Sequence, residues 1–237
     1  MLCPECGVQN GDDHNYCKNC GFPLKPGAIE RELSIGLAEK ARDRYELLVR
    51  LDPESPGAHF NLGLAYYHLG LLEEAITEFQ RTVALDETFA SAYFQLATCY
   101  FRRGMVNECI EACRAALLHN PASLPARYRM AHSLFHVGRL DEALEQFGQV
   151  VQADSGYVMA EYYIGVIHER LGNVNDAIGA FSRVTGANPN DASAHYHLGL
   201  NYKRAGLDDL AIGEFMHALR LDPADRASEA ELASLAR

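Results

Sequence analysis

A period of 34 residues runs through most of the chain and limits its fold more than any other feature. A small residue recurs at Ala41, Ala75, Cys109, Ala143, Ala177 and Ala211. Four positions further on stand Tyr45, Phe79, Cys113, Phe147, Phe181 and Phe215. A glycine recurs at Gly70, Gly104, Gly138, Gly172 and Gly206, and the units end at Asp52, Asp86, Asn120, Asp154, Asn188 and Asp222. Chance does not hold four registers together over this length, so the sequence predicts a row of similar structural units.

Each register has a physical reason. A glycine in a tight turn adopts a backbone conformation that strains other residues, so it divides each unit into two helices. Small residues in the first helix let the paired helices approach closely; they are Gly63, Ala97, Ala131, Gly165 and Gly199. A proline that stops the second helix follows four of the units, at Pro53, Pro121, Pro189 and Pro223. Because one unit cannot bury its own apolar side, we expect the units to stack.

This pattern resembles the tetratricopeptide repeat family, whose units carry Leu-Gly or Leu-Ala, then Tyr, Gly, Ala, Phe and Pro at this spacing. The resemblance implies an all-α superhelical solenoid with five full repeats, at 56–89, 90–123, 124–157, 158–191 and 192–225. Residues 28–55 match only the second half of a unit, and residues 226–237 are expected to form a capping helix. The family's tryptophan early in the first helix is replaced by His59, Tyr93, Arg127, Glu161 and His195. Their variety suggests that they contribute to what each repeat contacts.

Two Cys-x-x-Cys pairs stand near the N-terminus, Cys3 with Cys6 and Cys17 with Cys20. A gap of two residues lets both thiolates of a pair reach one ion at about 2.3 Å, as tetrahedral zinc requires. The odd total of seven cysteines argues against a closed set of disulfides and for metal binding in a reducing compartment. The spacing therefore predicts one zinc ion held by the four cysteines.

The same segment resembles the zinc-ribbon family over residues 2–24, in its Cys-Pro-x-Cys-Gly and Cys-x-x-Cys-Gly sequences and in Asn10, Tyr16 and Phe22. We interpret the zinc site as structural, because four thiolates leave no open position for a substrate. A redox dithiol is the weaker alternative, since no βαβ pattern surrounds the pairs. The expected domains are a ribbon at 1–24, a linker and half-repeat helix at 25–55, repeats at 56–225 and a capping helix at 226–237.

Composition excludes several classes of protein. A hydrophobic content of 48% excludes wholesale disorder. No apolar run approaches the roughly 20 residues of a membrane helix, and the first residues lack the apolar stretch of a signal peptide. The net charge of -11 disfavours nucleic acid as a partner, because phosphates require Lys and Arg. We therefore expect a cytoplasmic protein without a membrane segment.

In the family that the repeats resemble, the first helix of each unit lines the inner face of the solenoid. One aromatic series in that helix comprises Phe60, Phe94, Tyr128, Tyr162 and Tyr196, and a second comprises Tyr67, Phe101 and Phe135. Such aromatic residues serve packing in part, so the series has two interpretations: a ladder that contacts a ligand, and a structural consensus. Both stay open at this point.

Charge separates the two helix layers. The first-helix windows, 56–69 and its equivalents, hold seven Lys or Arg and two Glu, whereas the second-helix windows hold eighteen acids and five bases. Positive charge is thus concentrated on one layer of an acidic chain, although a charged face is often only solvated. The predicted partner-binding residues are Phe60, Asn61, Tyr67, Phe94, Phe101, Arg102, Tyr128, Arg129, His132, Phe135, His136, Tyr162, Arg170, Tyr196, Lys203 and Arg204.

These features favour a scaffold whose groove binds a peptide segment of another protein, acidic and with apolar anchors. A carboxylate clamp of the kind used by chaperone-binding family members is not expected, because Phe60 and Leu64 occupy its Lys and Asn positions. One alternative is a nucleic-acid or regulatory adaptor that acts through the ribbon, and another is self-association of the solenoids.

An enzymatic function is not expected. The sequence has no glycine-rich phosphate loop, no His-Glu-x-x-His pair and no Gly-x-Ser-x-Gly elbow. Cys109 and Cys113 lie one helical turn apart, but they occupy the core registers of their repeat. We therefore predict that they are small buried thiols and not metal ligands.

The zinc prediction is tested by metal analysis of the purified protein. We expect about one zinc ion per chain, and loss of most of it in Cys17→Ser, because three thiolates hold zinc much more weakly than four. Asn19→Ser, between two of the cysteines, is the matched control and should keep its zinc. Equal zinc content in both variants would contradict a four-cysteine site.

Overall fold

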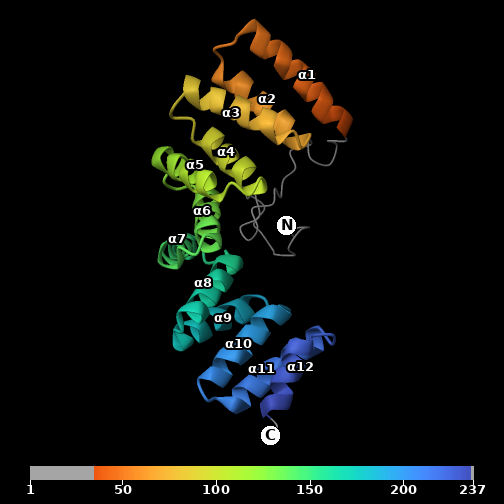
Figure 1. The fold of residues 1–237 in the computed structure, drawn as a ribbon, viewed down its shortest axis with the longest axis vertical. Helices are drawn as coiled ribbons and strands as arrows, with labels where there is room; N and C mark the ends of the chain where they lie inside the picture. The colour runs from red at the N-terminus through yellow and green to blue at the C-terminus, as the bar shows by residue number, and fades with distance from the viewer. Residues whose placement is uncertain (1–34, 236–237) are drawn as a thin grey trace. The chain divides into compact units, whose positions relative to one another are not determined.

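The computed structural model describes residues 35–235, and over that range it contains twelve α-helices and no strand (Figure 1). The helices are α1 (Ile35–Leu51), α2 (Pro56–His68), α3 (Leu72–Leu85), α4 (Ala90–Arg102), α5 (Val106–His119), α6 (Leu124–His136), α7 (Leu140–Ala153), α8 (Val158–Leu171), α9 (Val174–Ala187), α10 (Ala192–Arg204), α11 (Asp208–Leu221) and α12 (Arg226–Leu235). The predicted all-α class is confirmed. None of these helices is long and apolar enough to cross a membrane.

The chain divides into two compact units, one ending at Ala143 and the other beginning at Leu144, within α7. In the first unit α2 packs against α3 and α4 against α5, and α1 packs against α2. In the second unit α8 packs against α9 and α10 against α11, and α12 packs against α11. The pairs α2–α3, α4–α5, α8–α9 and α10–α11 are predicted 34-residue units, with the first helix followed by the second.

Glycine makes the turn inside each hairpin. All five glycines of the register have a positive φ, between 73° and 78°, and no other described residue has one. In the first repeat, the backbone N–H of Gly70 donates to the carbonyl of Tyr67 at 3.0 Å, and that of Leu71 donates to Tyr66 at 2.9 Å. These bonds satisfy carbonyls at the end of α2 that the helix leaves without partners. The predicted role of the glycine is confirmed.

A close contact between the two helices of a repeat forms the core. Phe79, Phe181 and Phe215 are fully buried, and each ring lies against a glycine of its own first helix. A Cβ atom placed on Gly199 would lie 2.8 Å from a ring carbon of Phe215, which is closer than van der Waals contact allows. The absence of a side chain on the first helix therefore makes room for the ring on the second.

In three repeats, the residue at the family's tryptophan position has a structural role. His195 is buried; its Nε2 donates to the carbonyl of Pro189 at 3.1 Å, and its Nδ1 lies 2.6 Å from the carboxylate of Glu214. His59 makes the equivalent two contacts in the first repeat. Glu161 is buried too and accepts two bonds from Arg183. The interpretation of these three residues as partner contacts is wrong: each is buried and bonded to other residues of the same compact unit.

Cys109 and Cys113 are fully buried, as the sequence predicts. Cys99 is fully buried too. The Sγ of Cys109 lies 3.2 Å from the hydroxyl of Ser133, and burial raises the pKa of the Cys99 thiol to about 12. Burial keeps that thiol protonated at neutral pH, which suits a packing group.

The glycine–phenylalanine contact makes opposite predictions for two glycines of the second unit. Gly199→Ala should destabilise the protein by about 1–3 kcal/mol, because the new methyl group displaces the ring of Phe215. Gly213→Ala should stabilise it by about 0.5–1 kcal/mol, because nothing lies within 4 Å of that position and alanine favours the helix. Urea denaturation followed by circular dichroism measures both changes. Equal effects of the two substitutions would contradict the contact.

Candidate functional site

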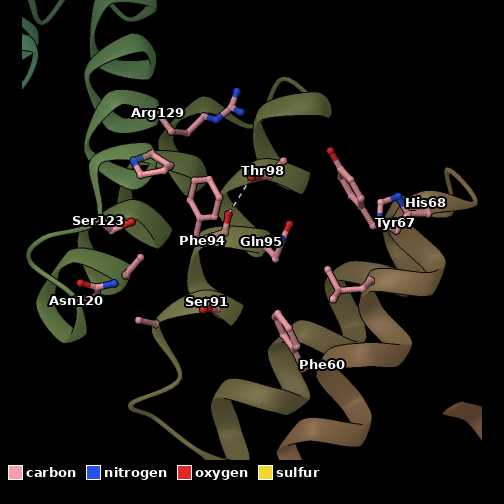
Figure 2. Close-up of a pocket in the computed structure, with 14 residues that line it drawn as sticks. Phe60, Tyr67, His68, Ser91, Phe94, Gln95, Thr98, Asn120, Ser123 and Arg129 are labelled. Atoms are coloured by element: carbon pink, nitrogen blue, oxygen red, sulfur yellow. Dashed lines mark hydrogen bonds between the residues drawn. The ribbon is translucent and has the colours of Figure 1, made fainter. Parts of the chain in front are cut away.

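Three successive first helices, α2, α4 and α6, line a cavity of about 570 Å³ in the first unit (Figure 2). Helix α4 lies in the middle, between α2 and α6. The lining residues are Phe60, Leu64, Tyr67, His68, Ala90, Ser91, Phe94, Gln95, Thr98, Ala116, Asn120, Ser123, Pro125 and Arg129. We call this cavity the α4 groove. Of the predicted partner-binding residues, Phe60, Tyr67, Phe94 and Arg129 line it.

Helical periodicity brings the lining residues of α4 to one face. After Ala90, the first residue of α4, they are Ser91 and the residues at i+3, i+4 and i+7 from it, positions that share one side of an α-helix. The hydroxyl of Thr98 donates to the carbonyl of Phe94 at 3.0 Å, so its methyl group and the ring of Phe94 are presented together (Figure 2). On the neighbouring helix, Ser123 caps α6 by accepting from the N–H of Ala126. The edge of the groove is therefore a helix N-terminus.

The aromatic wall of the groove also packs the repeat. The ring of Phe60 lies 5.7 Å from that of Phe79 and 4.9 Å from that of Phe89, measured between ring centroids. These contacts hold Phe60 in place while the same side chain lines the cavity. Phe60 therefore fits both interpretations of the aromatic series. Its ring is held by packing, and it also lines the groove.

Two arginines lie over aromatic rings of the preceding repeat. The guanidinium carbon of Arg102 is 5.0 Å from the ring centroid of Tyr67, and that of Arg129 is 4.7 Å from the centroid of Phe101. A guanidinium over a ring face is held by a cation–π interaction that leaves its N–H edge available. Within residues 35–235, neither arginine forms an ion pair with an acid. The Nε of Arg129 is buried and has no hydrogen-bond partner there.

The described lining of the groove carries no negative charge. None of the residues that line it within 35–235 is an aspartate or glutamate. The adjacent Arg103 is different from Arg102, because it forms an ion pair with Glu73 at 2.7 Å on the exposed side of the repeat. Arg129 is therefore the charged side chain of the described lining, and Arg102 lies over the ring of Tyr67, another lining residue.

A histidine pair lies beside the arginines. The rings of His132 and His136 are 4.5 Å apart, and that of Phe101 is 5.3 Å from His132. Burial, together with the charges of His136 and Arg129, lowers the pKa of His132 to about 4. Tyr128 stacks on His132 at 6.2 Å. These predicted residues form one aromatic and cationic cluster next to the groove.

Two predicted residues of the first unit point elsewhere. The side-chain amide of Asn61 donates to the carbonyl of Gly57 at 2.8 Å, within its own helix. Phe135 is buried. Neither lines the α4 groove.

In the second unit, acids neutralise most of the predicted positive lining. Arg204 lies 3.0 Å from Glu169, which also accepts from His197 at 2.8 Å. Lys203 donates to Glu231 of α12 at 2.6 Å. Ion pairs of this kind leave little net charge for a partner. Positive charge of the first-helix layer is therefore available to a ligand mainly in the first unit.

The remaining predicted residues of the second unit pack or lie at the surface. The ring of Tyr162 is 5.6 Å from Phe181, and that of Tyr196 is 6.0 Å from Phe215. The hydroxyl of Tyr162 is 2.9 Å from that of Ser193, and Arg170 is exposed.

Sequence reasoning missed several polar lining residues, among them Gln95, Asn120 and Ser123. Gln95 carries a usable signal, because it lies one position after Phe94 and shares the register of Arg129 in the next repeat. Asn120 and Ser123 belong to a connection between repeats, whose position depends on how α5 and α6 pack.

The predicted zinc ligands Cys3, Cys6, Cys17 and Cys20 lie outside the described residues, as does the ribbon boundary at residue 24. Among residues 35–235, no group of three or more His, Cys, Asp or Glu is arranged to hold a metal ion. The four cysteines and the domain boundaries stay predictions.

Family models agree with both sequence resemblances. The tetratricopeptide repeat model matches residues 30–88, 128–192 and 170–226, which together exceed half of the chain. The chain belongs to the tetratricopeptide repeat family. A model for subunit 3 of the anaphase-promoting complex, or cyclosome, matches residues 71–150, and a zinc-ribbon domain model matches residues 2–24. A comparison with curated proteins found no match.

Solved structures share the repeat fold at low identity. The crystal structure of YrrB, a TPR protein with an unusual peptide-binding site, is 19% identical, with a TM-score of 0.74 over 81% of this chain and 98% of YrrB. MamA from Desulfovibrio magneticus RS-1 is 19% identical, with a TM-score of 0.66 over 72% of this chain and 97% of the MamA chain. A chain of the APC/C hetero-tetramer Cut9–Hcn1 is 16% identical, with a TM-score of 0.59 over 86% of this chain and 40% of that chain. At these identities the likeness shows the fold alone.

The lowered pKa of His132 makes stability depend on pH. Because this pKa of about 4 lies below the ordinary value of 6.5, the unfolded chain binds the proton first as the pH falls. The stability that neutral His132 contributes is therefore complete above pH 6.5 and lost as the pH falls towards 4. Urea denaturation at pH 7 and pH 4.5 should show a larger loss for the wild type than for His132→Asn. The control His119→Asn, an exposed histidine, should lose as much as the wild type.

Proposed function

We propose that the protein is a binding scaffold whose α4 groove holds a peptide segment of another protein, with a carboxylate and an aliphatic or aromatic anchor. The observation that carries this proposal is the arrangement of Arg102 and Arg129 at a groove whose described lining contains no acid. Neither arginine is paired with a described acid. Membership of a family of protein-interaction repeats supports it. The peptide-binding site named for YrrB, a structural relative, is consistent with it.

The arginines favour a carboxylate as the polar anchor. Each guanidinium is fixed over a ring, so little side-chain entropy remains to be lost when it binds an anion. A carboxylate in the groove would accept hydrogen bonds from the terminal N–H groups of the guanidiniums. A charge-assisted hydrogen bond of this kind contributes about 1.5–3 kcal/mol. A cationic segment would meet like charge instead.

The hydrophobic part of the groove favours an apolar anchor. Phe60, Leu64 and Phe94 come from two neighbouring repeats and line it together. A volume of about 570 Å³ is within the range of ligand pockets and accommodates one or two large side chains with their backbone. Gln95 and Asn120 at the same cavity offer hydrogen bonds to a peptide backbone.

A structural zinc ribbon at residues 2–24 completes the proposed scaffold. The family match and the two cysteine pairs support it. Four thiolates would hold the ion, and its binding energy would fold a segment too short to fold on apolar contacts.

The proposal is tested with a phage-displayed random peptide library selected on the full-length protein. We expect the selected peptides to combine Asp or Glu with Leu, Ile or Phe. Fluorescence anisotropy should then show at least about tenfold weaker binding to Arg129→Met, because methionine keeps the aliphatic length and removes the charge. Affinity should also fall as salt rises, with a shallower slope in the double variant Arg102→Met and Arg129→Met.

Arg103→Met is the matched control. Arg103 follows Arg102 in the sequence but pairs with Glu73 on the exposed side, so this variant should bind like the wild type. Peptides without acids, or an affinity that neither salt nor the double variant changes, would overturn the proposal.

A further inference from the structure

One face of α1 is exposed to solvent. The equivalent face of each later second helix in the described chain is buried. At the register of Leu48, the later second helices carry Thr82, Ala116, Val150, Val184 and Ala218, each at most 1% exposed. Leu48 itself is 38% exposed. Ala41 and Tyr45 are only partly buried, whereas all five equivalents of each are fully buried. Three adjacent core registers therefore lack their cover in α1.

In the complete repeats, the first helix of the same repeat lies directly against these registers, as the contact of Gly63 with Phe79 shows. For α1 the equivalent window is 22–35, and its sequence contains Pro23, Pro26 and Gly27. Two prolines and a glycine within five residues disfavour a helix of this family there. The chain thus supplies the second half of a repeat without the sequence of the first.

The uncovered face is apolar and has a basic rim. Beside Leu48 lie Leu37, 40% exposed, Leu47, 54% exposed, and Leu51, 72% exposed. Lys40 and Arg44 follow Leu37 at i+3 and i+7, so they share its side of the helix. Neither forms an ion pair with an acid of the described chain. The acids Glu46 and Asp43 are paired with Arg42 instead.

The opposite end of the repeats is covered. In the second unit, α12 packs against α11, Ser228 of α12 is buried, and Glu231 of α12 binds Lys203. A terminal helix with this role is what a repeat array requires at each end.

We propose that the zinc ribbon of the same chain, residues 2–24, covers the open face of α1 and caps the repeats at that end. The tether is short enough to hold the ribbon there: residues 25–34 span at most about 35 Å when extended, and α1 is about 25 Å long. The segment carries the apolar residues Leu2, Val8, Tyr16, Phe22 and Leu24, and a segment this short is expected to leave apolar surface for a neighbour.

Charge complementarity selects the ribbon over a second copy of α1. The ribbon carries Glu5, Asp12 and Asp13 against Lys18, and a zinc ion with four thiolates adds a net charge of about -2. This acidic module suits the rim formed by Lys40 and Arg44. Two copies of α1 facing each other would bring these cations together.

The proposal is tested by hydrogen exchange with mass spectrometry on the full chain, with zinc bound and after its removal by a chelator. We expect amides of residues 35–51 to exchange at least about threefold faster without zinc, because the cap is lost. Amides of α11 in the second unit should not change. Unchanged exchange in α1 would overturn the proposal.

A second measurement keeps zinc in place and changes only the rim. The double variant Lys40→Glu and Arg44→Glu should accelerate cleavage by trypsin after Arg31, in the tether, by at least about threefold. Arg50→Glu with Arg81→Glu reverses two exposed charges away from this face and should cleave like the wild type. Equal rates in both variants would count against the ribbon. Light scattering that shows a dimer, with α1 protection that grows with concentration, would assign the face to a second copy.

Discussion

The close approach of the two helices within a repeat, which a glycine and a phenylalanine make in three of the five repeats, is the constraint on which the rest of the structure depends. It sets the distance between the two helices of a repeat, as Gly199 and Phe215 show. Helices this close bury one side of the first helix completely and leave the opposite side facing away from its partner. Wherever several first helices follow one another, that remaining side becomes a shared surface, and in the first unit it lines the α4 groove.

The same contact explains why aromatic residues serve two purposes. Phe60 packs on Phe79 and still lines the groove, so its ring is held rigidly at a ligand-accessible surface. The arginines then differ according to their neighbours. Arg129 lies over a ring and has no described acid, whereas Arg204 lies beside Glu169. The first helices thus offer positive charge to a ligand in the first unit, whereas acids neutralise that charge in the second unit.

Several features of the site were predictable because they depend on local pattern. The registers of Phe60, Phe94 and Arg129 follow from the repeat and the helical period. The assignment of Lys203 as part of a positive lining did not anticipate its ion pair, because Glu231 is 28 residues away on the terminal helix. His195 was misinterpreted for the same reason: its partner Glu214 lies on the other helix of its repeat. Such pairs depend on which faces meet in space.

The sequence by itself determined the repeat length, the helix pairs, the turn glycines and the buried thiols, because each depends on contacts within one repeating unit. Only the tertiary structure decided which cations remain available, where the cavity lies and which face of α1 is exposed. These depend on surfaces brought together from different repeats. A periodic sequence gives the same registers to every unit, but packing gives each unit different neighbours, and the exposure of a charge or a ring is set by its neighbours.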